Sequence, residues 1–182
     1  MRVTPTAIAE VLVIEPKVFA DARGFFFESY NERAFAEATG IAAKFVQDNH
    51  SRSVKNTVRG LHYQIGQAQG KLVRAVAGEI YDVVVDVRRK SPTFGHWVGH
   101  HLSAENKNML WIPAGFAHGF AVLSDYADFL YKTTDYWAPQ HERTLLWNDP
   151  DLGIDWQLAG EPILADKDRA GKRLAEAEVF DA

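Results

Sequence analysis

Short apolar runs recur along this chain between glycine, proline and polar turn residues. The clearest run reads Y-D-V-V-V-D-V-R, where alternation places Tyr81 and every second residue through Val87 on one face of a strand. Many short strands of this kind are typical of an antiparallel all-β domain. The sequence therefore predicts strands over residues 11–16, 43–47, 57–63, 72–77, 79–88, 97–102, 109–112, 119–123 and 129–133.

The connections between these strands carry few helical signals. Asn31 is predicted to cap a short helix that runs through Ala38, with Gly40 just beyond its end. A second helix is expected after Asp168, where R-A-G-K-R-L-A-E-A-E is rich in helix formers. Gly78, between two predicted strands, favours a tight hairpin. Many strands with two peripheral helices predict a barrel or sandwich with an internal cavity.

Length, charge and composition exclude several classes of protein. The 182 residues are enough for one domain with a substantial core, so a single domain over residues 1–182 is expected. A net charge of -4 gives no general attraction to nucleic acid or to an anionic membrane. Without cysteine the chain has no disulfide, thiolate nucleophile or thiolate metal site. No stretch resembles a signal peptide or a membrane span, so a cytoplasmic location is expected.

The stretch T-V-R-G-L-H-Y-Q-I-G-Q-A-Q-G-K places Arg59, His62 and Lys71 around a strand and a turn. Two cations and a potential proton acceptor could hold an anionic substrate and remove a proton from it. Simple alternation would send Arg59 and His62 to opposite faces of the strand. Both serve one site only if Gly60 permits a bulge or a bend.

Each further candidate has an ordinary structural reading as well. His118, in W-I-P-A-G-F-A-H-G-F, could simply bond a backbone carbonyl, and Tyr131 could fill the core. Arg23 lies in D-A-R-G-F-F-F-E, where alternation would place Phe25 and Phe27 together as core residues. Only the combination of these groups favours a catalytic site.

Several segments together resemble the dTDP-4-dehydrorhamnose 3,5-epimerase family, from about residue 23 to residue 172. The segments are V-R-G-L-H-Y-Q, Q-G-K-L-V-R, P-A-G-F-A-H-G-F, L-Y-K-T-T-D-Y and E-P-I-L-A-D-K-D. The resemblance implies a cupin-type jelly-roll barrel that forms a homodimer. It also implies inversion of C3 and C5 of dTDP-4-dehydro-6-deoxy-D-glucose, which gives dTDP-4-dehydro-L-rhamnose in the route to dTDP-L-rhamnose.

The resemblance also assigns roles to particular residues. His62 would be the general base, with Asp168 as its partner, and Tyr131 the proton donor on the opposite face of the sugar. Lys71 would stabilise the enolate oxygen. Trp137 would stack on the thymine. The remaining substrate contacts implied are Arg23, Glu28, Gln47, Asn49, Arg59, His118, Glu142 and Lys167.

Two of these assignments have a neighbour as an alternative. Asp166 would share a face with Asp168 if A-D-K-D were extended, so it is a second candidate for the partner of His62. Tyr136 adjoins Trp137 and could take its stacking role.

The chemistry of a 4-ketosugar fits this set, because the ketone acidifies the C–H bonds on both sides of it. A base, an acid and a cation suffice, so no redox or metal cofactor is expected. An epimerase acting at C3 only or C5 only could share all the residues. A metal-dependent cupin oxygenase would need more ligands, and the usual H-x-H reads His62-Tyr63-Gln64 here. A non-catalytic sugar-nucleotide binder is the third alternative.

Overall fold

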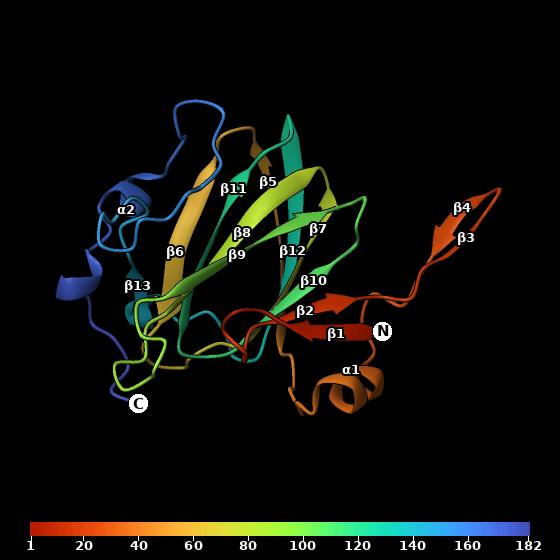
Figure 1. Cartoon of the computed structure of the whole chain (residues 1–182), viewed down its shortest axis with the longest axis horizontal. Coiled ribbons are helices and arrows are strands. Elements are labelled where there is room, and N and C mark those ends of the chain that lie inside the picture. Colours follow the sequence, from red (N-terminus) through yellow and green to blue (C-terminus); the bar gives the residue numbers. More distant parts are fainter.

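The computed structural model describes residues 1–182 and contains two antiparallel sheets that face each other (Figure 1). The six-stranded sheet has the order β1 (Arg2–Pro5), β2 (Leu12–Glu15), β10 (Met109–Ile112), β7 (Lys71–Ala77), β12 (Tyr126–Thr133), β5 (Gln47–Val54). The five-stranded sheet has the order β13 (Glu142–Thr144), β6 (Val58–Gln64), β11 (Phe116–Val122), β8 (Glu79–Asp86), β9 (Trp97–Ser103). This all-β jelly-roll architecture confirms the predicted fold class.

The remaining elements lie at the periphery. Strands β3 (Phe19–Asp21) and β4 (Gly24–Phe26) form a separate hairpin that projects from the body of the molecule (Figure 1). The helices are α1 (Glu32–Thr39), α2 (Asp166–Arg169) and the 3-10 turns η1 (Pro139–His141) and η2 (Leu174–Glu176). No helix is long and apolar enough to cross a membrane.

Apolar side chains from both sheets fill part of the space between them. Phe116 and Phe120 of β11 pack there with Phe129 of β12, and the rings of Phe120 and Phe129 are 4.4 Å apart. Polar side chains replace apolar ones where β5, β6, β7, β11 and β12 line a cavity. The core therefore supports the walls of the cavity.

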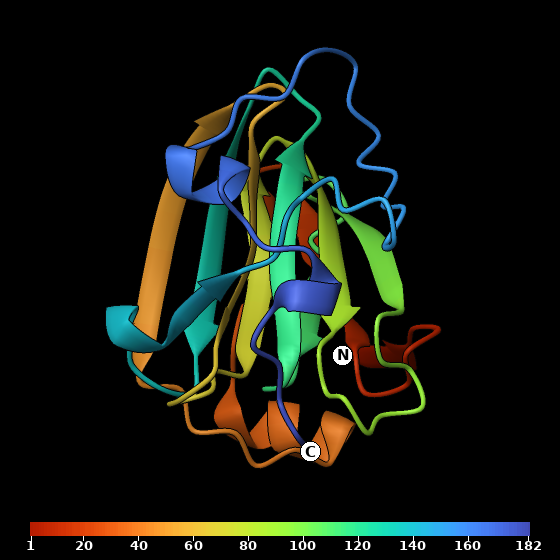
Figure 2. The same cartoon turned by 90° about the vertical axis from the view of Figure 1, so that its left-hand side faces the viewer.

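A second apolar cluster covers the outer face of the five-stranded sheet. Tyr81 and Val83, with Val85 and Val87, lie on this face, as the alternation predicts. Figure 2 shows the chain after β13 crossing it, and Trp156 from that segment joins the cluster. This crossing brings α2 against β6.

Helix α1 forms as predicted. The Asn31 side chain accepts a hydrogen bond from the Ala34 amide, and Gly40 ends the helix with φ 73°. The second predicted helix is wrong: α2 is a single turn, and the chain then pairs through Lys172 with Leu145. A Cβ at Gly171 would lie 2.7 Å from the Leu145 backbone, so this segment is held extended by a close main-chain contact.

Two strand predictions are also wrong. Residues 43–46 are irregular, and β5 begins at Gln47, where its pairing with Thr133 of β12 begins. Strands β7 and β8 do not form a hairpin across Gly78, since they belong to different sheets. Gly78 has φ 68° and lies where a Cβ would be 2.0 Å from the Tyr126 carbonyl oxygen, at the passage from one sheet to the other.

Candidate active site

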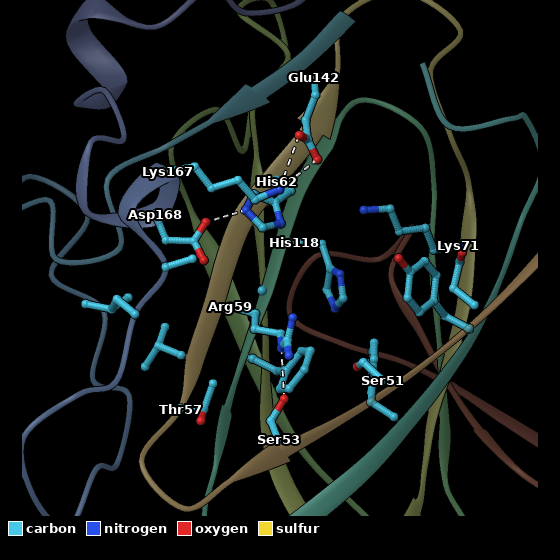
Figure 3. Close-up of a pocket in the computed structure, with 18 of the residues that line it drawn as sticks. Ser51, Ser53, Thr57, Arg59, His62, Lys71, His118, Glu142, Lys167 and Asp168 are labelled. Carbon is cyan, nitrogen blue, oxygen red and sulfur yellow. Dashed lines mark hydrogen bonds and ion pairs between the residues drawn. The ribbon is translucent and has the colours of Figure 1, made fainter. Parts of the chain in front are cut away.

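A cavity of about 830 Å³ opens between the two sheets (Figure 3). Every predicted site residue lines it except Arg23 and Glu28. The lining members come from β5 (Gln47, Asn49), β6 (Arg59, His62), β7 (Lys71), β11 (His118), β12 (Tyr131) and the segments that follow (Trp137, Glu142, Lys167, Asp168).

A β-bulge in β6 brings Arg59 and His62 to the same cavity. His62 pairs with His118 and Arg59 with Phe120, so Gly60 and Leu61 together oppose a single residue, Gly119. Gly60 has φ 117°, and a Cβ there would lie 2.7 Å from the Gly119 Cα. The bulge at Gly60 that a shared site for Arg59 and His62 requires is therefore present.

His62 is held by Asp168, the buried residue of α2. Its Nε2 lies 2.5 Å from Asp168 Oδ1, and Figure 3 shows this contact. In the neutral ring Nε2–H donates to the carboxylate, and Nδ1 is left as the proton acceptor. Asp166 is exposed, because residues 166–169 form a helical turn rather than the extended segment that would align the two aspartates.

An ion pair lies beside His62. Lys167 Nζ is 3.2 Å from both carboxylate oxygens of Glu142, which is paired with Gln64 at the edge of β6. Figure 3 shows this pair among the residues that line the cavity with His62. The cation of Lys167 therefore has a partner in the free protein, and an anionic ligand would compete with Glu142 for it.

Lys71 and His118 are buried in the wall of the cavity. Burial lowers the pKa of Lys71 to about 8, although Asp82 and Glu142 favour its charged form. His118 Nε2 donates to Asp82 Oδ2 over 2.9 Å, yet burial still lowers the pKa of His118. His118 is therefore a neutral hydrogen-bonding group near pH 7, and Lys71 is a cation that can lose its proton.

Tyr131 lies on β12, in the sheet that faces His62. Burial raises the pKa of Tyr131, with Glu142 adding to the effect and Arg59 opposing it. The phenol therefore keeps its proton at neutral pH. A base on one sheet and a protonated phenol on the other can act on opposite faces of one ligand.

The site also contains supporting residues that were not predicted from the sequence. Asp82 is fully buried and bonds His118, and Ser53 accepts a hydrogen bond from Arg59 Nε over 2.8 Å. The signal for Asp82 was available, because a carboxylate inside an apolar strand requires a buried partner. Ser53 gave no signal, because β5 was not predicted.

The two aromatic candidates differ in position. Trp137 lines the cavity, and Tyr136 does not, although both side chains are exposed. Of these two rings, Trp137 is the one placed to contact a ligand in the cavity.

Arg23 and Glu28 lie outside the cavity of their own chain. Arg23 is at the turn of the β3–β4 hairpin and pairs with Asp21, and its side chain is 90% exposed. Glu28 accepts a hydrogen bond from Asn31 ahead of α1. Phe25 is 62% exposed on the same hairpin, so its predicted place in the core is wrong.

No group of three or more histidine, aspartate and glutamate side chains is placed to hold a metal ion. Gln64 occupies the position where an H-x-H motif would supply its second histidine, and its amide is bonded to backbone groups. The absence of a cofactor stays a prediction.

Comparison with known proteins identifies the family. The model of the family described as dTDP-4-dehydrorhamnose 3,5-epimerase matches residues 5–176. The chain belongs to this family. It is therefore an epimerase, an enzyme of the isomerase class with a cupin-type fold.

Individual relatives agree with this membership. The dTDP-4-dehydrorhamnose 3,5-epimerase of Pseudomonas aeruginosa is 66% identical over 180 residues, which cover 99% of each chain. The crystal structure of a dTDP-6-deoxy-D-glucose-3,5-epimerase from Legionella pneumophila, in complex with dTDP-4-keto-L-rhamnose, has a TM-score of 0.95 at 53% identity and covers 97% of this chain and 94% of its own. A dTDP-4-dehydrorhamnose 3-epimerase of Streptomyces niveus is 39% identical and covers 97% of this chain and 86% of its own.

Proposed function

We propose that this epimerase inverts both C3 and C5 of dTDP-4-dehydro-6-deoxy-D-glucose and so produces dTDP-4-dehydro-L-rhamnose. The observation that carries the proposal is the His62–Asp168 pair on one side of the cavity with Tyr131 on the facing sheet. Inversion at carbon requires a base and an acid on opposite faces of the sugar ring, and these residues supply both.

His62 Nδ1 removes the proton next to the C4 ketone. A positioned general base of this kind contributes a factor of about 10²–10⁴ to the rate. The Asp168 carboxylate, bonded to Nε2, stabilises the imidazolium that forms. The negative charge moves to the C4 oxygen, where the Lys71 ammonium contributes about 3 kcal/mol, the size of a typical oxyanion contact.

Tyr131 then donates its proton to the opposite face of the same carbon. Its raised pKa keeps the hydroxyl protonated before the enolate forms. The enolate carbon is a strong enough base to take a proton from a phenol. Once His62 has released its proton to solvent and the Tyr131 phenolate has taken one up, the same sequence at the second carbon completes the double inversion.

The nucleotide part of the substrate takes the rest of the cavity. Arg59 supplies a cation for the diphosphate and is held in place by Ser53. Trp137 offers a ring for the thymine. Arg23 and Glu28 complete this site from a second copy of the chain, and the enzyme acts as a homodimer.

Epimerisation at C3 alone is the second candidate. It is favoured by the Streptomyces niveus relative, a 3-epimerase that aligns over 178 residues. Incubation with the 4-ketosugar nucleotide in deuterated water, followed by NMR, distinguishes the two. Deuterium at C3 and C5 supports the double epimerase, and deuterium at C3 alone supports the alternative.

Tyr131→Phe tests the division of roles between the two residues. The variant keeps the ring and the base, so His62 can still form the enolate and return a solvent deuteron to the original face. We expect NMR to show continued deuterium incorporation, with inverted product formed at least about 100-fold more slowly, the size of a lost general acid.

His62→Ala is the matched control and should lose both exchange and inversion. Equal loss of exchange and inversion in Tyr131→Phe, with fold and affinity intact, would contradict these roles. Near-normal epimerisation would remove Tyr131 from the mechanism.

A further inference from the structure

Glutamine side chains hold the backbone of residues 135–138, the loop that presents Trp137 to the cavity. Gln69 Nε2 donates to the Asp135 carbonyl over 2.9 Å, and Gln47 Oε1 accepts from the Trp137 amide over 3.0 Å. The Thr133 hydroxyl also donates to the Asp135 carbonyl. This loop is therefore fixed by side chains from the walls of the cavity rather than by regular secondary structure.

Gln64 of β6 makes the central contacts. Its Oε1 accepts from the Ala138 amide over 2.9 Å, and its Nε2 donates to the Tyr136 carbonyl over 3.2 Å and to the Gln67 carbonyl over 2.8 Å. These bonds hold the loop on both sides of Trp137. Gln64 lines the cavity but is only 5% exposed, and both ends of its amide are occupied, so its polar atoms act on a ligand through the loop.

The Trp137 side chain itself is 59% exposed, so packing does little to fix it. Its direction depends on the backbone that carries it, which Gln47 holds at the Trp137 amide and Gln64 holds on both sides. A ring held in place before binding loses less entropy when a flat ligand stacks on it.

We propose that Gln64 is a positioning residue that fixes Trp137 as a preformed stacking surface for the base of a nucleoside diphosphate. This inference rests on the proposed function, in which the substrate is a nucleotide sugar. Gln64 occupies the position where a metal-dependent cupin has a ligand histidine. In this chain, that position would instead help to recognise the base.

The test separates the base from the phosphates by using dTDP and inorganic pyrophosphate as probes in calorimetry. Gln64→Leu removes all three hydrogen bonds at similar volume. We expect its affinity for dTDP to fall about tenfold, as for a lost stacking contact, while its affinity for pyrophosphate stays within about twofold. With the sugar nucleotide, KM should rise and kcat should stay within about threefold.

A double-mutant cycle with Trp137→Ala identifies the route of the effect. If Gln64 acts through Trp137, the double variant should bind dTDP no more weakly than Trp137→Ala alone. Thr93→Val is the matched control, because it removes a hydrogen bond to Asp86 away from the cavity and should change neither affinity.

Circular dichroism checks that the variants fold, and Gln64→Asn replaces Gln64→Leu if the latter does not. Gln64→Asn stays neutral, but its amide is one methylene shorter and cannot keep the bonds on both sides of Trp137, so it should show the same selective loss. Equal losses for dTDP and pyrophosphate, additive losses in the cycle, or equal affinities of the wild type for the two probes would overturn the inference. These binding measurements need no turnover, so failure of the proposed reaction is detected separately by the deuterium assay.

Discussion

Lys71 is a cation whose charge is set by its surroundings. It is 8% exposed, and burial lowers its pKa to about 8. The ammonium is thus the main form below that pH and is lost as the pH rises through it. If this charge stabilises the enolate, kcat/KM should fall above about pH 8. The pH dependence of kcat/KM measures this, because that ratio reports the ionisation of groups in the free enzyme.

Lys71→Arg is the control for this profile, because a guanidinium stays charged at every accessible pH. The variant should be less active, since the larger group replaces a buried lysine, but its remaining activity should not decline with rising pH. A flat wild-type profile through the same range would show that the charge of Lys71 does not limit the reaction.

At this scale the sequence predicted residue types better than it predicted their partners. Asp168 is the first candidate and Asp166 the second for the partner of His62, and the helical turn of α2 places only Asp168 against His62. Gln64 was noticed only as a missing metal ligand, because its bonds go to a loop about 70 residues along the chain. Contacts of this kind depend on the tertiary fold and leave no local pattern.

The β6 strand shows how an element creates the site. Gly60→Ala should destabilise the fold by about 2–4 kcal/mol, because the new Cβ meets the Gly119 Cα and the His118 carbonyl oxygen at a position with positive φ. Urea unfolding measures the loss. Epimerase activity should fall as well, because the bulge brings Arg59 and His62 together.

Gly153→Ala is the control for a glycine of positive φ that has room for a Cβ. Gly153 also has a positive φ, but a Cβ there would have no neighbour within 4 Å. The control should therefore cost only the backbone strain, about 1–2 kcal/mol, and leave activity unchanged. Equal destabilisation by both substitutions would mean that the contact between Gly60 and Gly119 adds nothing.

Strands with an apolar face were predictable, and those without one were not. The alternation along β8 indicated a strand whose valines share a face, and the structure buries them. β5 is a strand of comparable length, but its inward residues are polar and line the cavity. The polar residues that create the site also remove the alternation of apolar residues by which a strand is predicted.

At the scale of the whole molecule, the β3–β4 hairpin pairs with no other strand of its own chain, although the Lys107 ammonium lies 4.4 Å from the Phe25 ring centroid. It projects from the two sheets, and Phe19, Phe25 and Phe26 on it are more than half exposed (Figure 1). Apolar side chains grouped on a projecting hairpin are typical of an interaction surface. In the proposed homodimer, a second copy of the chain would cover them and would bring Arg23 to a cavity that lacks it.

Complementation between two inactive variants tests this arrangement. If Arg23 serves the cavity of the other copy, Arg23→Ala and His62→Ala should each be nearly inactive alone. After the two are unfolded and refolded together, half of the dimers are mixed, and each mixed dimer has one site with both lesions and one intact site. About a quarter of the wild-type activity should therefore return, as the two-fold symmetry of a dimer requires.

Arg23→Ala mixed with Asp168→Asn should behave in the same way, because Asp168 also belongs to the His62 side. His62→Ala mixed with Asp168→Asn is the negative control: both residues belong to the site of one chain, so every site of the mixed dimer keeps one lesion and no activity should return. Native mass spectrometry checks that mixed dimers form. If they form and Arg23→Ala with His62→Ala recovers no activity, Arg23 lies outside the partner's site.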